Sequence, residues 1–176
     1  MRLSTIEETK RAEKLSKLPA HWVNHFSRDF PSLAHKHQLA PERANSGADW
    51  TCWLILGGRG AGKTRAGAQC VHDVAAGDRH ACIALIGETE HDVREVMVEG
   101  VSDLLAVHEH NERPQWISSR RRLEWPNGAV AQVFSAEELE SLRGPQFSAA
   151  WYDELAKWRQ VLGLGMTDAL FGDIAQ

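Results

Sequence analysis

Three short apolar runs stand out along the chain. They occupy residues 51–56 (TCWLIL), 81–86 (ACIALI) and 147–152 (FSAAWY). Each run is nearly continuous in apolar residues instead of alternating with polar ones, which is typical of strands buried on both faces of a parallel sheet. The pattern therefore predicts three buried strands.

Helices are expected between these strands. Residues 63–76 contain few helix breakers, and Gly77 follows them as a stop signal. Thr89 is a candidate N-cap for a helix that runs to about residue 98, and residues 101–107 can add another turn. Strands that alternate with helices predict an α/β fold with a mainly parallel sheet flanked by helices.

A hairpin is predicted near the middle of the chain. Pro126, Asn127 and Gly128 lie between two strand-like runs, residues 121–125 and 129–134, and Asn-Gly between such runs is a strong hairpin signal. Residues 137–142 are then expected to form a short helix. The predicted organisation is an N-terminal helical or irregular segment over 1–50, a core over 51–159 and a divergent tail over 160–176.

Composition narrows the function classes. The chain has 176 residues, 43% of them hydrophobic, and a net charge of −4. Such a composition indicates a globular domain and excludes a uniform polycation, although a basic patch can still occur. The longest apolar stretch is far shorter than a membrane span needs to be, so no membrane association is expected.

The cysteines and histidines indicate little chemistry. Cys52, Cys70 and Cys82 are odd in number and lack a CxxC spacing, which favours reduced thiols in an intracellular protein. The closest approach to a histidine metal pattern is the pair His35 and His37, or His108 and His110. Neither pair has a second ligand cluster at a useful spacing, so a histidine metal site is not expected.

The strongest functional motif follows the first apolar run. Residues 57–64 (GGRGAGKT) fit the P-loop pattern G-x4-G-K-[ST] between a predicted strand and a predicted helix. Glycines let successive N–H groups turn inward, and the helix adds its positive end, so the loop can bind phosphates. The nucleotide-binding candidates are Gly57, Gly58, Arg59, Gly60, Ala61, Gly62, Lys63 and Thr64.

Within this loop, Lys63 would contact the β- and γ-phosphates, and Thr64 would offer its hydroxyl to Mg²⁺. Asp153 and Glu154 directly follow the third apolar run, so they are expected at the carboxyl edge of the sheet, where the loop also opens. Asp153 is then the candidate magnesium partner and Glu154 the candidate catalytic base. Taken alone, the two acids would also suit the first turn of a helix.

The nucleotide is expected to be ATP. The chain has no N-K-x-D motif for reading guanine, and adjacent Asp-Glu is unusual for small GTPases. ATP and Mg²⁺ are therefore the predicted cofactors.

Several stretches together resemble the large terminase subunit of tailed phages, closest to the branch found in prophages and gene transfer agents. They are residues 53–68 (WLILGGRGAGKTRAGA), 87–89 (GET) with 93–100 (VREVMVEG), 141–146 (SLRGPQ) and 151–158 (WYDELAKW). The resemblance covers roughly residues 38–159. It implies a P-loop ATPase of the additional-strand type that drives double-stranded DNA into a procapsid.

The resemblance also implies roles for single residues. Arg59 resembles the arginine that reaches the phosphates within the same subunit, and Arg143 the arginine donated to a neighbouring subunit's ATP. Gln38 resembles a glutamine that contacts adenine upstream of the loop. The implied partners are DNA, the portal protein and the small terminase subunit, with a homo-oligomeric ring for the full-length protein and a cytoplasmic location in the bacterial host.

Residues 120–122 (RRR), ahead of the hairpin, have two interpretations. They could contact DNA phosphates. A charged edge that protects the hairpin from pairing with other strands is the interpretation we favour.

The end of the chain departs from the family pattern. The coupling motif, later ATPase strands and nuclease are not seen after residue 159, so we expect an incomplete fragment without nuclease activity. The strand that usually separates the two halves of the site is also missing, unless residues 161–164 (VLGL) replace it. Two alternatives to the terminase interpretation are a helicase-like ATPase and a decayed remnant that binds nucleotide or partner proteins without catalysis.

Overall fold

The structure is a computed structural model. It describes residue 10 and residues 13–14, 16–19, 29–100, 102–108 and 111–158. The chain divides into two compact units, Met1–Ala66 and Gly67–Gln176, and each is described here by itself. The tail predicted at 160–176 and most of the helix-prone N-terminus lie outside the described residues, and the predicted domain boundaries stay a prediction.

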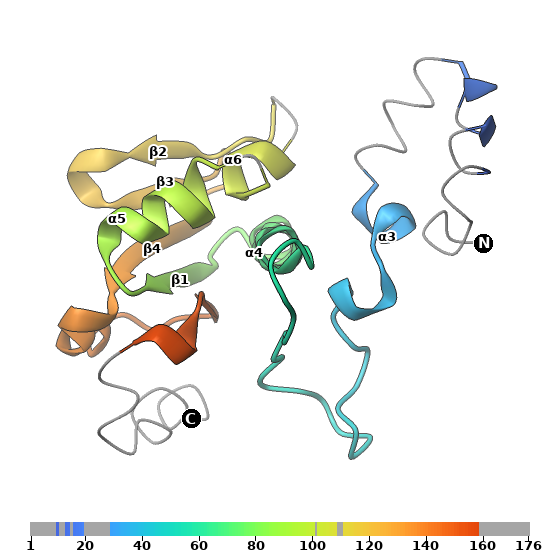
Figure 1. Cartoon of the computed structure of the whole chain (residues 1–176). Coiled ribbons are helices and arrows are strands. Elements are labelled where there is room, and N and C mark those ends of the chain that lie inside the picture. The colour runs from blue at the N-terminus through green and yellow to red at the C-terminus, as the bar shows by residue number, and fades with distance from the viewer. Residues whose placement is uncertain are drawn as a thin grey trace. The chain divides into compact units, whose positions relative to one another are not determined.

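From residue 29 onward, the first unit contains α3 (Phe30–Leu33), the 3₁₀ turn η2 (Lys36–Gln38) and the start of α4 (Lys63–Gly77) (Figure 1). Its buried cluster consists of Phe30, Ala34 and Ala66, with Leu39, Trp53 and Ile55 packed against them.

The strand predicted at 51–56 is wrong. The segment has no helix or strand assignment and pairs with no strand among the described residues. Trp53 and Ile55 pack on the cluster of the first unit, whereas Leu54 and Leu56 are 69% and 82% exposed. A continuous apolar run predicts burial on two faces, but this segment is covered on one.

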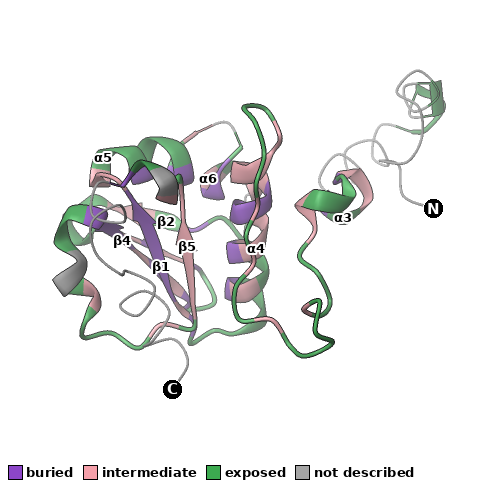
Figure 2. Cartoon of the chain, turned by 60° about the horizontal axis from the view of Figure 1, so that its bottom comes forward, coloured by how far each residue is buried: buried purple, intermediate pink, exposed green. Residues whose placement is uncertain are grey.

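The second unit is built on a five-stranded sheet in the order β2-β3-β4-β1-β5. The strands are β1 (Cys82–Gly87), β2 (Gln115–Ile117), β3 (Arg122–Glu124), β4 (Val130–Ser135) and β5 (Ala149–Tyr152). Figure 2 shows that β1 is buried along most of its length and that β5 is half-buried. The predicted strands at 81–86 and 147–152 are therefore confirmed, although the second is less buried than expected.

The sheet is mixed, which corrects the prediction of a mainly parallel one. β1 is parallel to both β4 and β5, whereas β3 is antiparallel to both β2 and β4. The predicted hairpin is itself the main reason, because strands joined by such a short loop must run antiparallel. The short strand β2, which the sequence analysis missed, adds a second antiparallel pairing.

The hairpin turn has the expected chemistry. The Trp125 N–H donates to the Ala129 carbonyl at 2.9 Å, and Gly128 adopts a φ of +107° that favours glycine. The Asn127 amide donates to the Ala75 carbonyl at 2.7 Å and so ties the turn to the end of α4. The prediction at these residues is confirmed.

The helices follow the predicted boundaries closely. α4 spans Lys63–Gly77, and the Thr89 hydroxyl accepts from the Asp92 N–H at 3.1 Å ahead of α5 (Glu90–Asp92). The same helix continues as the π-helical turn η3 (Val93–Val98), and α6 (Leu104–Val107) follows it. The second unit also contains the 3₁₀ turns η4 (Ser118–Arg120), η5 (Ala136–Leu142) and η6 (Leu155–Lys157).

Side chains of β1 alternate between two cores. Ile83 and Leu85 face a cluster with residues of α4, η3, α6 and the hairpin strands. Ala84 and Ile86 face a second cluster with Phe134, Trp158 and residues of η5 and η6. The sheet is thus covered on both faces around β1, which explains why that run is continuously apolar.

Candidate functional site

The glycine-rich loop at 57–64 belongs to the first unit. Gly60 and Gly62 have φ values of +80° and +75°, which other residues rarely adopt. The Ala66 N–H donates to the Gly62 carbonyl at 3.0 Å, and the fifteen-residue helix α4 begins at Lys63. The backbone therefore turns sharply and enters a helix N-terminus, as a phosphate-binding loop requires.

Lys63 lies against its own loop. Its ammonium donates to the carbonyls of Gly57 at 2.9 Å and Gly58 at 3.1 Å. Phosphate oxygens could replace these two carbonyls as the acceptors of the ammonium, so its position is compatible with phosphate binding. The next residue, Thr64, is half-buried at the first turn of α4.

Gln38 also lies at this loop, twenty-four residues before Gly62. Its amide nitrogen lies 3.5 Å from the Ala61 carbonyl and 3.4 Å from the Gly62 carbonyl, and its amide oxygen accepts from the His35 N–H at 2.8 Å. A Cβ at Gly62 would overlap the Gln38 amide. The structure therefore brings Gln38 to the loop, as its proposed contact with nucleotide requires.

The acidic pair belongs to the second unit. The Asp153 N–H donates to the Ile86 carbonyl at 3.0 Å, which continues the pairing of β5 with β1. Asp153 and Glu154 therefore follow the carboxyl end of β5, beside the carboxyl end of β1. Glu154 adopts a left-handed backbone conformation (φ 49°, ψ 40°), which is uncommon for a residue other than glycine.

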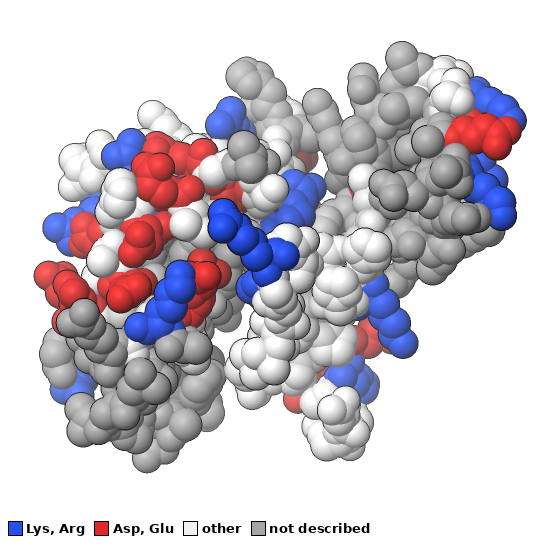
Figure 3. Space-filling view, in the orientation of Figure 1, with Lys and Arg blue, Asp and Glu red and all other residues white. Residues whose placement is uncertain are grey.

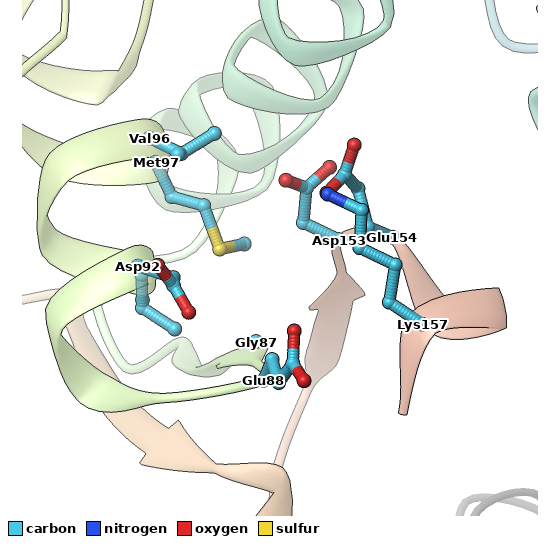
Figure 4. Close-up of a pocket in the computed structure, with 9 residues that line it drawn as sticks. Gly87, Glu88, Asp92, Val96, Met97, Asp153, Glu154 and Lys157 are labelled. Carbon is cyan, nitrogen blue, oxygen red and sulfur yellow. The ribbon is translucent and has the colours of Figure 1, made fainter. Parts of the chain in front are cut away.

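A cavity of about 170 Å³ opens at this edge of the sheet (Figure 4). Its polar lining consists of the carboxylates of Glu88, Asp92, Asp153 and Glu154 and the ammonium of Lys157. Val93, Val96 and Met97 supply the apolar wall. Glu88, Asp92 and Lys157 were not predicted as site residues. Glu88 and Asp92 follow the second apolar run, so the same sheet-edge argument could have placed them here.

Lys157 forms an ion pair with Glu154, three residues earlier. The hydrogen bond and charge of Glu154, together with the charges of Glu88 and Asp153, raise the pKa of the Lys157 ammonium. Lys157 is therefore firmly cationic at neutral pH.

The loop and the acidic pair fall in different units, so their expected meeting in one site stays a prediction. Gly67 in α4, the helix that the loop enters, lies directly against the indole of Trp151 in β5. Arg59 and Arg143 are both exposed, and their predicted roles also stay predictions.

The three arginines ahead of the hairpin face acidic partners. Arg121 pairs with Glu90, and Arg120 and Arg122 both pair with Glu124. These pairs favour the interpretation of a charged edge, because two carboxylates offset much of the positive charge that would attract DNA phosphates.

A second cavity, of about 220 Å³, was not foreseen from the sequence. Residues from three separate segments line it, among them His72, His108 and Trp125. The Trp125 indole donates to His108 Nε2 at 2.7 Å, so Nδ1 carries the proton and donates to the Leu104 carbonyl at 2.5 Å. His108 is thus a neutral packing residue.

One buried acid lies away from both cavities. Asp103 is 0% exposed, and neither of its carboxylate oxygens has a hydrogen-bond partner of normal geometry among the described residues. Burial raises the pKa of Asp103 to about 6, while the N–H groups of Ala106 and Leu105 and the charge of Arg113 oppose the rise. This residue is a candidate source of pH-dependent stability.

Two wider observations complete the description of the site. Over the ranges that the structure describes, no group of three or more histidine, cysteine, aspartate and glutamate side chains is arranged to hold a metal ion. A magnesium ion held largely by phosphates and water does not need such a group, and the predicted roles of Thr64 and Asp153 as magnesium partners stay predictions. Within the same ranges, every helix is too short or too polar to traverse a bilayer.

The fold is α/β, and residues 57–64 form a glycine-rich loop whose sequence fits the P-loop pattern. Residues 54–162 match the family described as terminase large subunit, T4likevirus-type, N-terminal. Because the match covers more than half of the chain, the chain belongs to this family. It includes residues 57–64, Arg143 and the acidic pair, whereas Gln38 precedes it. No curated protein and no solved structure matches the chain.

Proposed function

We propose that this chain is the ATP-binding and ATP-hydrolysing motor domain of a terminase large subunit, which drives double-stranded DNA into a phage procapsid. The observation that carries the proposal is the family match, because it spans both the glycine-rich loop and the acidic pair. The helicase-like alternative has no comparable support.

The geometry of the loop fits a nucleoside triphosphate. Gly60 and Gly62 have the backbone conformations that turn N–H groups inward, α4 presents its N-terminus, and Lys63 lies over the loop. The amide nitrogen of Gln38 lies 3.4 Å from the Gly62 carbonyl, which supports a contact between Gln38 and a nucleotide at this loop. We assign phosphate binding to the loop N–H groups and to Lys63, and a nucleotide contact to Gln38.

The acidic pair fits the remaining requirements. Bound magnesium would neutralise charge on the β- and γ-phosphates. Thr64 and Asp153 would hold it, Glu154 would orient and deprotonate the attacking water, and Arg59 and Arg143 would stabilise charge on the transferring phosphoryl group.

We further propose the additional-strand type of P-loop fold and assembly of the full-length protein as a ring. DNA, the portal protein and the small terminase subunit are the proposed partners. The proposed location is the host cytoplasm, with transient binding at the procapsid portal.

The test compares ATP binding and hydrolysis in the wild type and three variants. Lys63→Ala is expected to lose most ATP binding, because the loop loses its phosphate-binding cation. Glu154→Gln is expected to bind ATP but lose hydrolysis by a factor of about 10² or more. Lys17→Ala removes an exposed lysine that pairs with Glu13, so it serves as the charge-matched control.

Each outcome is informative. Equal ATP binding by the wild type and Lys63→Ala would contradict nucleotide binding by the loop. Binding that depends on Lys63, without turnover that depends on Glu154, would instead support the non-catalytic remnant.

A further inference from the structure

Arg65 lies in the first turn of α4, two residues after Lys63. Its guanidinium lies over the ring of Phe30, 5.4 Å from the ring centroid. Phe30 is 7% exposed and forms the buried cluster of the first unit with Ala34 and Ala66. A guanidinium stacked on an aromatic face still has its N–H groups available at the edge of its plane. The stacking therefore positions the cation without using its hydrogen-bond donors.

Arg65 is a half-buried cation without an anionic partner in the described part of the chain. Elsewhere Arg43 pairs with Asp49 and Arg94 with Glu99, and Figure 3 shows basic and acidic side chains lying next to one another in several places. Burial alone lowers the pKa of the Arg65 guanidinium, although an arginine remains a cation at neutral pH. Burying a charge costs free energy unless an anion or hydrogen-bond acceptors compensate it. Arg65 therefore has unused capacity to bind an anion.

The cluster beneath Arg65 also brings η2 to the glycine-rich loop. Leu39 packs against this cluster, and the residue before it, Gln38, has its amide nitrogen 3.4 Å from the Gly62 carbonyl. Arg65 and Gln38 are therefore held at the loop by the same cluster. Lys63 instead contacts the carbonyls of the residues that begin the loop.

We infer that Arg65 is a further nucleotide-binding residue, whose guanidinium binds the α-phosphate next to the nucleoside that Gln38 contacts. The inference rests on the proposed function of the loop. Phosphate oxygens are the anionic acceptors that this guanidinium lacks, and a planar guanidinium can bind two of them at once. The β- and γ-phosphates are the expected ligands of Lys63, so the α-phosphate is the one that remains for Arg65.

The test measures the dissociation constants of ATP and ADP by isothermal titration calorimetry. Arg65→Met keeps an apolar stem over Phe30 and removes the charge, and we expect it to bind both nucleotides about tenfold more weakly than the wild type, because both carry the α-phosphate. Arg65→Lys keeps the charge without the planar fork, so an intermediate affinity is expected. In steady-state hydrolysis by Arg65→Met, KM should rise while kcat stays within about twofold, as expected for the loss of a binding contact.

The control variant is Arg43→Met. Arg43 belongs to the same unit but is exposed and paired with Asp49, so its loss is expected to leave both affinities unchanged. Thermal unfolding followed by circular dichroism checks that each variant is folded. A packing role on Phe30 alone would lower the unfolding midpoint of Arg65→Met and leave its nucleotide affinity unchanged.

Three outcomes would overturn the inference: equal ATP affinity in the wild type and Arg65→Met, an equal loss in Arg43→Met, or a loss for ATP without one for ADP. The third would place the contact at the γ-phosphate. Failure of the proposed function looks different, because ATP binding would then be absent or insensitive to Lys63→Ala, and the inference would fail with it.

Discussion

Two apolar runs of similar length, residues 51–56 and 81–86, have different fates in this chain. The second run forms β1, which pairs with β4 on one edge and with β5 on the other, and which packs into a core on each face. The first run pairs with no strand in the described part of the chain and leaves Leu54 and Leu56 largely exposed.

The difference teaches what an apolar run predicts. Burial of an apolar segment stabilises the folded state, by roughly 1.5–3 kcal/mol for a fully buried leucine. Apolar composition alone does not show whether other parts of the chain are available to cover the segment. β1 is covered by a strand on each edge and by a core cluster on each face. Among the described residues, the segment 51–56 packs against the cluster around Phe30, Ala34 and Ala66.

The largest expected contrast between the two runs is in amide hydrogen exchange. The amides of Leu85 and Ile86 lie in a central strand and should exchange only through global unfolding, whereas those of Leu54 and Leu56 should exchange nearly freely. We expect protection to differ by a factor of about 10³ or more, measured by mass spectrometry of peptides from each run. Comparable protection in both would show that residues 51–56 form a paired strand.

A charge placed in each run should sharpen the same contrast. Leu85 is 0% exposed, so Leu85→Asp buries an unpaired carboxylate and is expected to lower the free energy of unfolding by about 4 kcal/mol or more. Leu56→Asp, at a position that is 82% exposed, should change it by less than about 0.5 kcal/mol. Urea denaturation followed by circular dichroism measures both. A large loss in Leu56→Asp would contradict the exposed position.

The next expected effect is a loss of stability when the close packing of α4 on the sheet is disturbed. A Cβ at Gly67 would overlap the indole of Trp151, so Gly67→Val is expected to cost about 1–3 kcal/mol by overpacking. Gly77→Ala is the matched control on the same helix, since a Cβ there meets no atom within 4 Å. Thermal unfolding of the two variants should place the midpoint of Gly67→Val well below that of Gly77→Ala, and equal midpoints would argue against the contact.

The smallest expected effect is on the pH dependence of stability. The raised pKa of Asp103, about 6 against an ordinary 3.8, means that the folded protein binds this proton more tightly than the unfolded chain does. The contribution of Asp103 to the free energy of unfolding therefore rises as pH falls from about 7 to about 4, by roughly 1–3 kcal/mol.

Asp103→Asn removes the titrating group and should reduce this rise, measured by urea denaturation at about pH 5 and about pH 7.5. Asp49, whose side chain is 91% exposed near the first run, provides the control, and Asp49→Asn should leave the slope unchanged. An unchanged slope in Asp103→Asn would show that water reaches this carboxyl.

Local signals predicted much of the second unit. Thr89 caps a helix, Asn127-Gly128 makes a hairpin, and Gly77 ends α4, because each depends on the chemistry of a few adjacent residues. Longer-range features escaped prediction. β2 is three residues long and becomes a strand only by pairing with β3. The π-helical turn at Val93–Val98 could not be distinguished from an α-helical turn by the spacing of its apolar residues.

The candidate site shows the same division. The loop glycines, Lys63 and the acidic pair could be named from their motifs, and Gln38 from a family resemblance. The ion pair between Lys157 and Glu154 could also have been predicted from the sequence, because the two residues are three positions apart. The cavity beside His72 could not, because packing assembles its lining from segments far apart in the sequence.

The left-handed backbone at Glu154 has a consequence for how this position evolves. Glycine adopts such a conformation without penalty, and a glutamate there costs about 1 kcal/mol, so selection for stability alone would favour glycine. Glu154→Gly should therefore yield a slightly more stable protein, and the proposed reaction would lose its base. If Glu154 is the proposed base, a mutational library sorted for folding would favour glycine at this position, and the same library sorted for ATP turnover would favour glutamate.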